Sequence, residues 1–265
     1  INELTNKKYG IFLVTGPTGS GKSTTLSACL KNIATPERNV ITVEDPVEYQ
    51  IQGVGQIAVN AKVGLTFASG LRSILRQDPD VVMVGEIRDK ETAEIAINAS
   101  MTGHLVLSTL HTNDAPGSIT RLVDMGIEPF LISSSVVGVL AQRLIRKLCQ
   151  NCAESFEAKD SDLNIGDITK EFLEKRYNKN RFVLKKIKGC GECRYTGYKG
   201  RAAIYELMVV SDEIRALINA NEDSNNIRKL AVKQGMQSLR DSALNKLVEG
   251  LTSIDEVLRL TQTDG

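Results

Sequence analysis

Short apolar runs alternate with amphipathic stretches over the first half of the chain. Residues 23–33 place Leu26, Leu30 and Ile33 at helical spacing, and Pro36 closes that segment, so the pattern predicts a helix. Four apolar runs have the length and β-branched content of buried strands: residues 9–15, 40–43, 81–84 and 105–109. Short, continuously apolar strands separated by helices indicate an α/β fold with a mostly parallel central sheet covered on both faces.

The second half of the chain has a different character. Residues 153–188 are rich in Lys, Asp, Glu and Asn and lack an apolar period, which indicates a peripheral insertion. Four helical segments follow: residues 212–220, 225–235, 238–250 and 253–260. Gly235 and Gly250 are expected at helix ends, and Ser253 with Glu256 has the spacing of a capping box. We therefore expect three parts: a core over 1–148, an insertion over 149–200 and a small helical subdomain over 201–265.

Composition and charge narrow the class of protein. The chain has 265 residues, 42% of them hydrophobic, which is enough for a normal globular core. Its 33 basic and 32 acidic residues give a net charge of +1, so no summed field attracts a polyanion and nucleic acid is not an expected partner. No apolar run reaches the roughly 20 residues of a membrane helix, and no basic-then-apolar leader stands at the start, so we expect a soluble, cytoplasmic protein. Because the chain opens at Ile1 without a Met, we also expect a fragment of a longer protein.

The strongest motif follows the first predicted strand. GPTGSGKS fits G-x-x-x-x-G-K-[ST] at every fixed position, between a strand and a helix. Its glycines turn backbone N–H groups toward phosphate oxygens, Lys22 reaches the outer phosphates, and the Ser23 hydroxyl takes a place on Mg²⁺. The alternative is a glycine-rich turn that binds nothing. The expected nucleotide-binding residues are Gly16, Pro17, Thr18, Gly19, Ser20, Gly21, Lys22, Ser23 and Thr24.

Phosphoryl transfer also needs an acidic group near the metal and a group that orients the attacking water. Glu86 follows the apolar run 81–84, where a Walker B carboxylate would stand, and Glu44 with Asp45 follows the run 40–43. In a parallel sheet both carboxylates would emerge at the carboxyl edge, beside the phosphate loop. The alternative is that each of them caps a neighbouring helix.

The two histidines of the chain flank the run 105–109. A strand of this length spans about 20 Å, so His104 and His111 cannot both reach one phosphate. His111 is expected at the carboxyl edge and is the better candidate for sensing the γ-phosphate, whereas His104 is a candidate structural histidine or interface contact.

Two arginines of the segment LRSILRQD are candidates for contacting a nucleotide. Arg72 and Arg76 are four residues apart, so on a helix they share one face, and they would act as arginine fingers in cis or from a neighbouring subunit. The alternative is a solvated basic face. Arg88 is a further candidate of the same kind.

Four of the five cysteines form two Cys-x-x-Cys pairs. Cys149, Cys152, Cys190 and Cys193 have the pattern of a tetrahedral Cys₄ zinc site, although the loop between the pairs is longer than in compact zinc fingers. With all four positions filled by protein, the zinc would be structural. Cys29 is interpreted as a small buried apolar residue.

In these segments the chain resembles the ATPases of type II secretion and type IV pilus assembly. Four boxes carry the resemblance: GPTGSGKST, TVEDPVEY, RQDPDVVMVGEIRD and TGHLVLSTLHTND. DMGIEPFLISSSVVGVLAQRLIRKLC and the region ending GYKGRAAIYEL also look like this family. Retraction ATPases generally lack the tetracysteine element, so the resemblance favours the secretion and pilus-extension members.

The resemblance implies a RecA-like P-loop NTPase that hydrolyses ATP as a ring-shaped hexamer. Such a ring would lie peripherally at the inner face of the inner membrane and act on platform and adaptor proteins. Carried over by position, Lys22 and Ser23 bind phosphate and Mg²⁺, Glu86 and Glu44 are the catalytic and metal-organising carboxylates, and Glu86 shares the magnesium ion with Ser23. By the same resemblance, His111 reads the γ-phosphate, while Arg72 and Arg76 act in trans or position the nucleotide. The family's N-terminal domain is absent from this chain, so we expect it to bind nucleotide but hydrolyse it poorly.

Three other functions compete with a secretion motor. Type IV pilus extension is the nearest, because GVGQI and GIEPFLISSSVVGVLAQR favour secretion members by a small margin only. A DNA-translocating ATPase of the conjugation type is disfavoured by the even charge and by the lack of basic and aromatic stretches. A nucleotide-gated scaffold would use ATP binding alone.

Overall fold

The computed structural model describes residues 1–159, 162 and 169–261. The chain divides into two compact units, each made of two segments: residues 1–143 with 205–238, and residues 144–204 with 239–265. Two of the three boundaries between them fall inside long strands, β6 (Val136–Leu148) and β9 (Tyr198–Val209), which the sequence analysis did not predict. The third boundary lies directly before Leu239. The sequence-based boundaries at 148/149 and 200/201 follow composition, and they stay an expectation about folding units.

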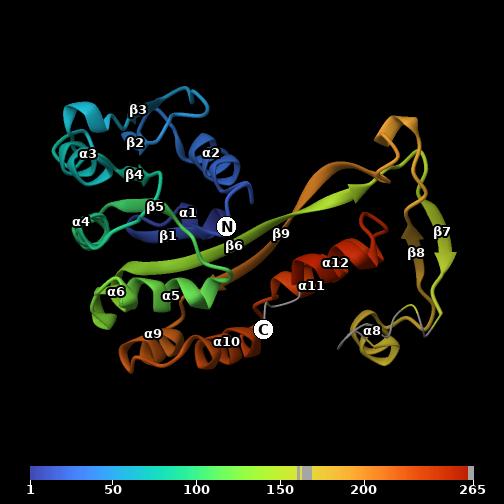
Figure 1. Ribbon diagram of the computed structural model, residues 1–265. Coiled ribbons are helices and arrows are strands. Elements are labelled where there is room, and N and C mark those ends of the chain that lie inside the picture. Colours follow the sequence, from blue (N-terminus) through green and yellow to red (C-terminus); the bar gives the residue numbers. More distant parts are fainter. Residues whose placement is uncertain (160–161, 163–168, 262–265) are drawn as a thin grey trace. The chain divides into compact units, whose positions relative to one another are not determined.

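Seven strands form the main sheet, in the order β3-β2-β4-β5-β1-β6-β9 (Figure 1). The other five strands are β1 (Gly10–Thr15), β2 (Val40–Glu44), β3 (Val54–Ala58), β4 (Val81–Val84) and β5 (Leu105–Leu110). The pairs β1–β5, β1–β6, β2–β3, β2–β4 and β4–β5 are all parallel. The predicted α/β fold with a mostly parallel sheet is therefore confirmed, and the carboxyl ends of these strands meet at one edge.

The helix after the first strand follows the predicted apolar spacing. Helix α2 (Lys22–Ile33) buries Leu26, Leu30 and Ile33 against Phe12 and neighbouring strand residues, which forms one layer of the core. Because successive strand residues face opposite sides of a sheet, Ile11 and Leu13 point to the other layer, where α4 packs on β1 and β5. The remaining helices of this unit are α1 (Asn2–Thr5), η1 (Ala61–Val63), α3 (Phe67–Ile74), α4 (Lys90–Met101), α5 (Ala115–Asp124), α6 (Pro129–Ser135), α9 (Asp212–Asn219) and α10 (Ser224–Lys233).

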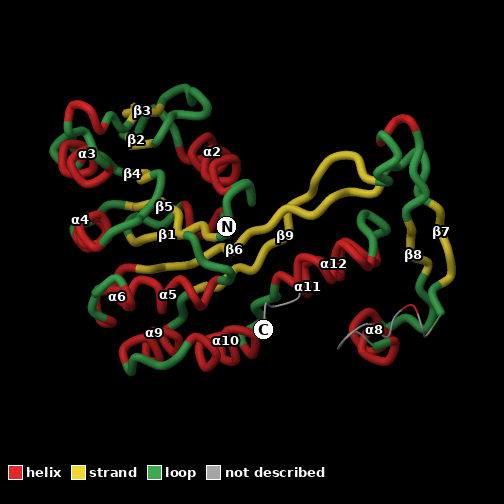
Figure 2. The backbone as a smooth tube through the Cα atoms, in the orientation of Figure 1, coloured by secondary structure: helices red, strands yellow, loops and turns green. Residues whose placement is uncertain are grey.

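In the second unit, the described residues include a small sheet and several short helices (Figure 2). Strands β7 (Glu154–Glu157) and β8 (Val183–Lys186) pair antiparallel inside the segment in which the sequence showed no period. The helices among these described residues are α8 (Lys170–Tyr177), η2 (Gly191–Cys193), α11 (Leu239–Val248) and α12 (Ile254–Thr261). Residues 160–161 and 163–168 of the predicted insertion, and 262–265 of the predicted helical subdomain, lie outside the described residues.

The capping box predicted at the start of α12 forms only in part. Ser253 Oγ accepts a hydrogen bond from the Glu256 N–H at 3.3 Å, as the motif requires. The Glu256 carboxylate, fully buried, instead accepts hydrogen bonds from Arg146 and Arg259, at distances from 2.7 to 2.9 Å. Charge-assisted hydrogen bonds to two guanidinium groups are stronger than one to a backbone amide, which explains the different partner.

Among the described residues, no helix combines the length and the apolar character needed to cross a bilayer.

Candidate functional site

The phosphate loop connects β1 to α2 and depends on three glycines. Gly16, Gly19 and Gly21 have φ of 146°, 77° and 89°, a backbone conformation that other L-residues rarely adopt. At Gly16 a Cβ would also lie 2.3 Å from the carbonyl oxygen of Gln142, so the backbones approach too closely for any side chain. Gly21 stands at the N-cap of α2, where the first-turn N–H groups and the helix dipole favour a negatively charged ligand.

Lys22 lies folded against the loop that precedes it. Its Nζ donates hydrogen bonds to the carbonyls of Gly16 at 2.8 Å and Pro17 at 3.2 Å. Burial lowers the pKa of Lys22, and the negative charge of Glu86 works against that shift. This interaction brings together two residues that the sequence predicted for one site.

Gln142 fixes the loop from β6, and the sequence analysis missed it. This buried side chain donates from Nε2 to the carbonyl of Ser20 at 2.8 Å and accepts at Oε1 from the Thr25 hydroxyl at 2.6 Å. A buried amide group is costly unless it is hydrogen-bonded. A single glutamine within the apolar sequence of β6 could therefore have indicated a buried polar contact. Gln142 thus connects the loop to the first turn of α2.

Glu86 and His111 meet at the carboxyl edge of the sheet. His111 Nε2 lies 3.5 Å from a carboxylate oxygen of Glu86, and Arg88 forms an ion pair with the same carboxylate. Strand β5 holds the turn that carries Glu86, since Thr109 Oγ1 donates to Gly85 O at 2.7 Å and the Ile87 N–H donates to Thr109 O at 3.0 Å. Side chains from the ends of two adjacent strands therefore meet at this edge, and their catalytic roles stay a prediction.

His104 lies at the opposite end of β5. Its Nδ1 donates to the carbonyl of Ala99 at 2.9 Å, near the C-terminal end of α4. The ring thus satisfies a carbonyl of the last helical turn, which agrees with the structural interpretation.

The second carboxylate segment, at the end of β2, has two parts. Glu44 accepts hydrogen bonds from Thr42 of its own strand at 2.6 Å and from Gln56 of the neighbouring β3 at 2.9 Å, so both strands hold its carboxylate. Four residues further on, Glu48 accepts from the Ser23 hydroxyl at 3.4 Å. Hydroxyl and carboxylate oxygens are ligands that Mg²⁺ prefers. Glu48 belongs to the segment TVEDPVEY, but the sequence alone did not suggest a role for it.

The two candidate arginines do not share one helix. Helix α3 ends at Ile74, so Arg72 occupies its last turn and Arg76 lies beyond it, which corrects the prediction of a common helical face. Arg72 pairs with Glu91 at 2.7 Å, while Arg76 donates to the Arg72 carbonyl at 3.0 Å and, at 3.4 Å, to Ser73 Oγ. Their role toward a nucleotide stays a prediction.

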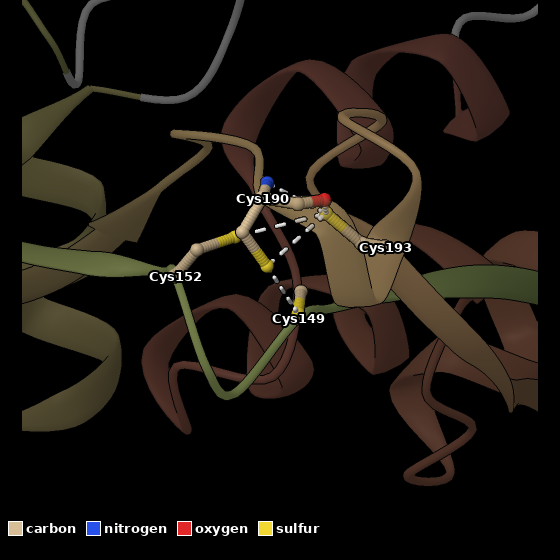
Figure 3. A group of neighbouring side chains, drawn as sticks. All are labelled: Cys149, Cys152, Cys190 and Cys193. Carbon is tan, nitrogen blue, oxygen red and sulfur yellow. Dashed lines mark hydrogen bonds between the residues drawn. The ribbon is translucent and has the colours of Figure 1, made fainter.

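The four cysteines form one cluster in the second unit. Cys149 and Cys152 lie in the turn after β6, Cys190 directly precedes η2 and Cys193 is its last residue, and the sulfur atoms point toward one another (Figure 3). All four Sγ atoms lie within 4.8 Å of one another, and the pairs 149–190, 152–193 and 190–193 are separated by 3.9, 3.8 and 3.8 Å. A tetrahedron with Zn–S bonds of about 2.3 Å has edges of about 3.8 Å. The donor set therefore fits zinc, with no position left open.

One of these thiols, that of Cys193, has a lowered pKa. Burial opposes ionisation of Cys193, but four hydrogen bonds to its sulfur together outweigh burial and lower its pKa to about 6: two from the N–H groups of Cys190 and Gly197, at 3.2 Å each, and two from the thiols of Cys152 and Cys190, at 3.8 Å each. A thiolate is the form that binds a metal ion.

A parallel sheet that delivers a glycine-rich phosphate loop to a helix N-terminus, with acidic residues at the same edge, defines the class of P-loop nucleotide-binding domains. Residues 1–259 match the sequence model of a family described as type II/IV secretion system protein. The chain belongs to this family, and the predicted resemblance is confirmed.

Three similar proteins illustrate the relationship. Type II secretion system protein E of Pseudomonas aeruginosa is 54% identical over 264 residues, which cover 100% of this chain and 51% of that protein. The type IV pilus assembly ATPase PilB of Thermus thermophilus is 52% identical over 260 residues, 98% of this chain and 28% of PilB. A crystal structure of the pilus retraction motor PilT with bound ADP has a TM-score of 0.72 at 31% identity, and the match covers 99% of this chain and 64% of that one. The chain thus spans about half the length, or less, of these two curated relatives.

Proposed function

We propose that the protein containing this chain hydrolyses ATP and uses the energy to drive type II protein secretion. The observation that carries the proposal is the convergence at one sheet edge of the phosphate loop, Glu86 and His111, with Lys22 influenced by the charge of Glu86. The high identity to a type II secretion system protein E supports secretion as the process.

Each residue of this edge has a chemical task in that reaction. The N–H groups from Gly19 to Lys22 would bind phosphate oxygens, and Lys22 would leave the loop carbonyls to reach the outer phosphates. Glu86 would orient the attacking water and accept its proton, and His111, in contact with Glu86, would register the γ-phosphate. Because Thr42 and Gln56 hold Glu44, we assign the base role to Glu86 and an organising role to Glu44.

Two metal ions complete the proposal. A bound Mg²⁺ would neutralise charge that develops on the phosphates, and the oxygen donors that would hold it are the Ser23 hydroxyl and the Glu86 carboxylate, with Glu48 beside Ser23. Zinc on the four cysteines would be structural, because the cluster itself fills a tetrahedral shell.

The partners follow from the family. We propose a hexamer of the full-length protein, located in the cytoplasm and peripherally attached to the inner membrane, which acts on membrane platform and adaptor proteins. Arg72 and Arg76 would contact the nucleotide across subunits, after Arg72 leaves its exposed ion pair with Glu91. Such a pair contributes at most about 1 kcal/mol, so the exchange is energetically accessible.

Type IV pilus extension is the second candidate. The 52% identity to PilB of Thermus thermophilus favours it almost as strongly. Complementation separates the two: the full-length gene should restore secretion to a strain lacking its own type II ATPase and should leave a strain lacking pilus extension without pili.

Turnover by purified full-length protein tests the enzymatic proposal. Lys22→Ala should abolish hydrolysis together with tight nucleotide binding, whereas Glu86→Gln should abolish hydrolysis and still bind ATP. Undiminished turnover in both variants contradicts the proposal. Stimulation by DNA, with a steep dependence on salt, would point to a translocase instead.

A further inference from the structure

A buried carboxylate of the first unit lies outside the proposed catalytic edge. Glu206 of β9 is 1% exposed, and its Oε1 accepts a hydrogen bond from the backbone N–H of Ala115 at 2.8 Å. Its Oε2 accepts one from Arg228 Nη1 at 3.2 Å. Burying a carboxylate this deeply costs free energy of folding unless a positive charge and hydrogen bonds compensate it. The burial of Glu206 therefore depends on the contacts that it makes.

Arg228 connects this carboxylate to the start of α5. Its Nη2 lies 2.7 Å from an oxygen of Asp114, and the other Asp114 oxygen accepts from the Gly117 N–H at 2.7 Å, which caps the helix. One guanidinium from α10 therefore holds two carboxylates, and both of them bind backbone at the first turn of α5.

The residues just before α5 also contact the sheet edge that carries the phosphate loop and Glu86. Thr112 Oγ1 donates to the carbonyl of Asp114 at 2.9 Å, and the Thr112 N–H donates to Thr15 Oγ1 at 2.9 Å. Thr15 directly precedes Gly16 of the phosphate loop, and His111 beside Thr112 contacts Glu86. Hydrogen bonds and ion pairs, joined by one or two residues of backbone, thus link α10 to both sides of the site.

We propose that Arg228 and Glu206 are positioning residues for hydrolysis, which fix the turn 111–114 so that His111 faces Glu86. The inference rests on the proposed ATPase function and extends it: helix α10, far along the chain, sets the geometry of the γ-phosphate sensor. Because a shift of about 1 Å in a catalytic group can reduce a rate about 100-fold, holding this turn has a direct kinetic effect. Neither residue touches substrate, so both act through the turn.

The test compares Arg228→Ala with Lys229→Ala in the full-length protein. Lys229 is the next residue of α10 and is exposed, so its replacement removes the same charge and no contact of the turn. Arg228→Ala should lower kcat at least tenfold, change the Kd for ADP less than twofold, and erase most of the preference for a non-hydrolysable ATP analogue over ADP. Arg228→Lys should recover part of kcat, and Lys229→Ala should match the wild type.

A double variant separates positioning from stability. Arg228→Ala with Glu206→Gln removes the uncompensated buried charge, so thermal stability should return toward the wild-type value while kcat stays low. Recovery of kcat together with stability, or an Arg228→Ala enzyme with unchanged kcat and nucleotide preference, overturns the inference. A wild-type protein that binds nucleotide without turnover refutes the proposed ATPase function. The ratio of the two nucleotide affinities then still tests whether Arg228 positions His111. A wild-type protein that binds no nucleotide refutes both.

Discussion

The nucleotide edge of the first unit and the cysteine cluster of the second are built in opposite ways. The edge gathers the phosphate loop, Glu86 and His111 from separate strands, and two of its side chains stay accessible, with His111 49% and Arg88 64% exposed. In the cluster, the four sulfur atoms lie within 4.8 Å of one another. An open site can exchange a ligand during turnover, whereas a closed one can only hold its ion. Substitutions in the cysteine cluster should therefore lower the stability of the fold, and substitutions at the nucleotide edge should lower the rate of ATP hydrolysis.

Removing the metal should have the largest effect. Zinc bound to four thiolates contributes on the order of 10 kcal/mol to small metal-dependent folds, so chelation or Cys190→Ser should unfold the second unit. Elemental analysis of the metal-replete protein should find about one zinc per chain, as a single Cys₄ site requires. Cys29→Ala is the matched control, because this cysteine lies in the first unit and should leave the zinc content unchanged. A zinc content near zero in folded protein would refute the metal assignment.

Glu86→Gln tests the other side of the comparison. The change removes a general base, so we expect kcat of the full-length protein to fall 100- to 10,000-fold, or about 3–5 kcal/mol of activation free energy. The unfolding temperature should stay within about 2 °C, because the new amide can still contact His111. Glu44→Gln, measured in parallel, should reduce kcat less. Equal losses in the two variants would contradict the division of roles.

Acid should destabilise the second unit through Glu256. Burial disfavours its charge, but hydrogen bonds from Arg259 and Arg146 outweigh burial and hold its pKa at about 2, below the ordinary value of 4.5. A lowered carboxylate pKa stabilises the fold above the ordinary value, and that contribution is lost as the pH falls from about 4.5 toward 2. The difference corresponds to about 3 kcal/mol. Unfolding monitored against pH should show this loss in the wild type and a flatter curve in Glu256→Gln, while Glu249→Gln, at an exposed pair, should behave like the wild type.

The smallest expected effect concerns Gln142. Gln142→Ala removes the two hydrogen bonds that tie Ser20 and Thr25 to β6, so nucleotide affinity should fall about tenfold, equivalent to about 1.4 kcal/mol. Gln142→Glu keeps an acceptor for Thr25 but loses the donor to Ser20, so an intermediate Kd is expected in calorimetry. If both variants bind ADP like the wild type, the loop does not depend on this anchor.

Much of the fold and part of the candidate site could be predicted from local pattern. The strands at 10–15, 81–84 and 105–110 match their apolar runs almost residue for residue, because buried parallel strands need continuous apolar sequence. Strand β6 was missed although it is apolar, since an apolar run can equally be a buried helix. Strand β9 alternates buried and exposed residues in its second half only, so its period was too short to detect.

The C-terminal helices show a second limit of local pattern. The sequence groups all four in residues 201–265, and that grouping stays a prediction about folding units. In the structure, α9 and α10 lie in the first compact unit, whereas α11 and α12 lie in the second. Apolar residues at helical spacing show that a helix has an apolar face. Only the tertiary structure shows which element packs against that face.

The sequence by itself determined the chemistry that neighbouring residues can supply: a glycine-rich loop for phosphate, two cysteine pairs for a metal, and carboxylates at strand ends. The tertiary structure alone decided which distant residues support that chemistry, namely Gln142 on the phosphate loop and Arg228 with Glu206 behind His111. The physical reason is that motif residues are linked by a few bonds of backbone, so their spacing is fixed locally. A glutamine 122 residues from its partner becomes an anchor only when strand order and register bring the two together.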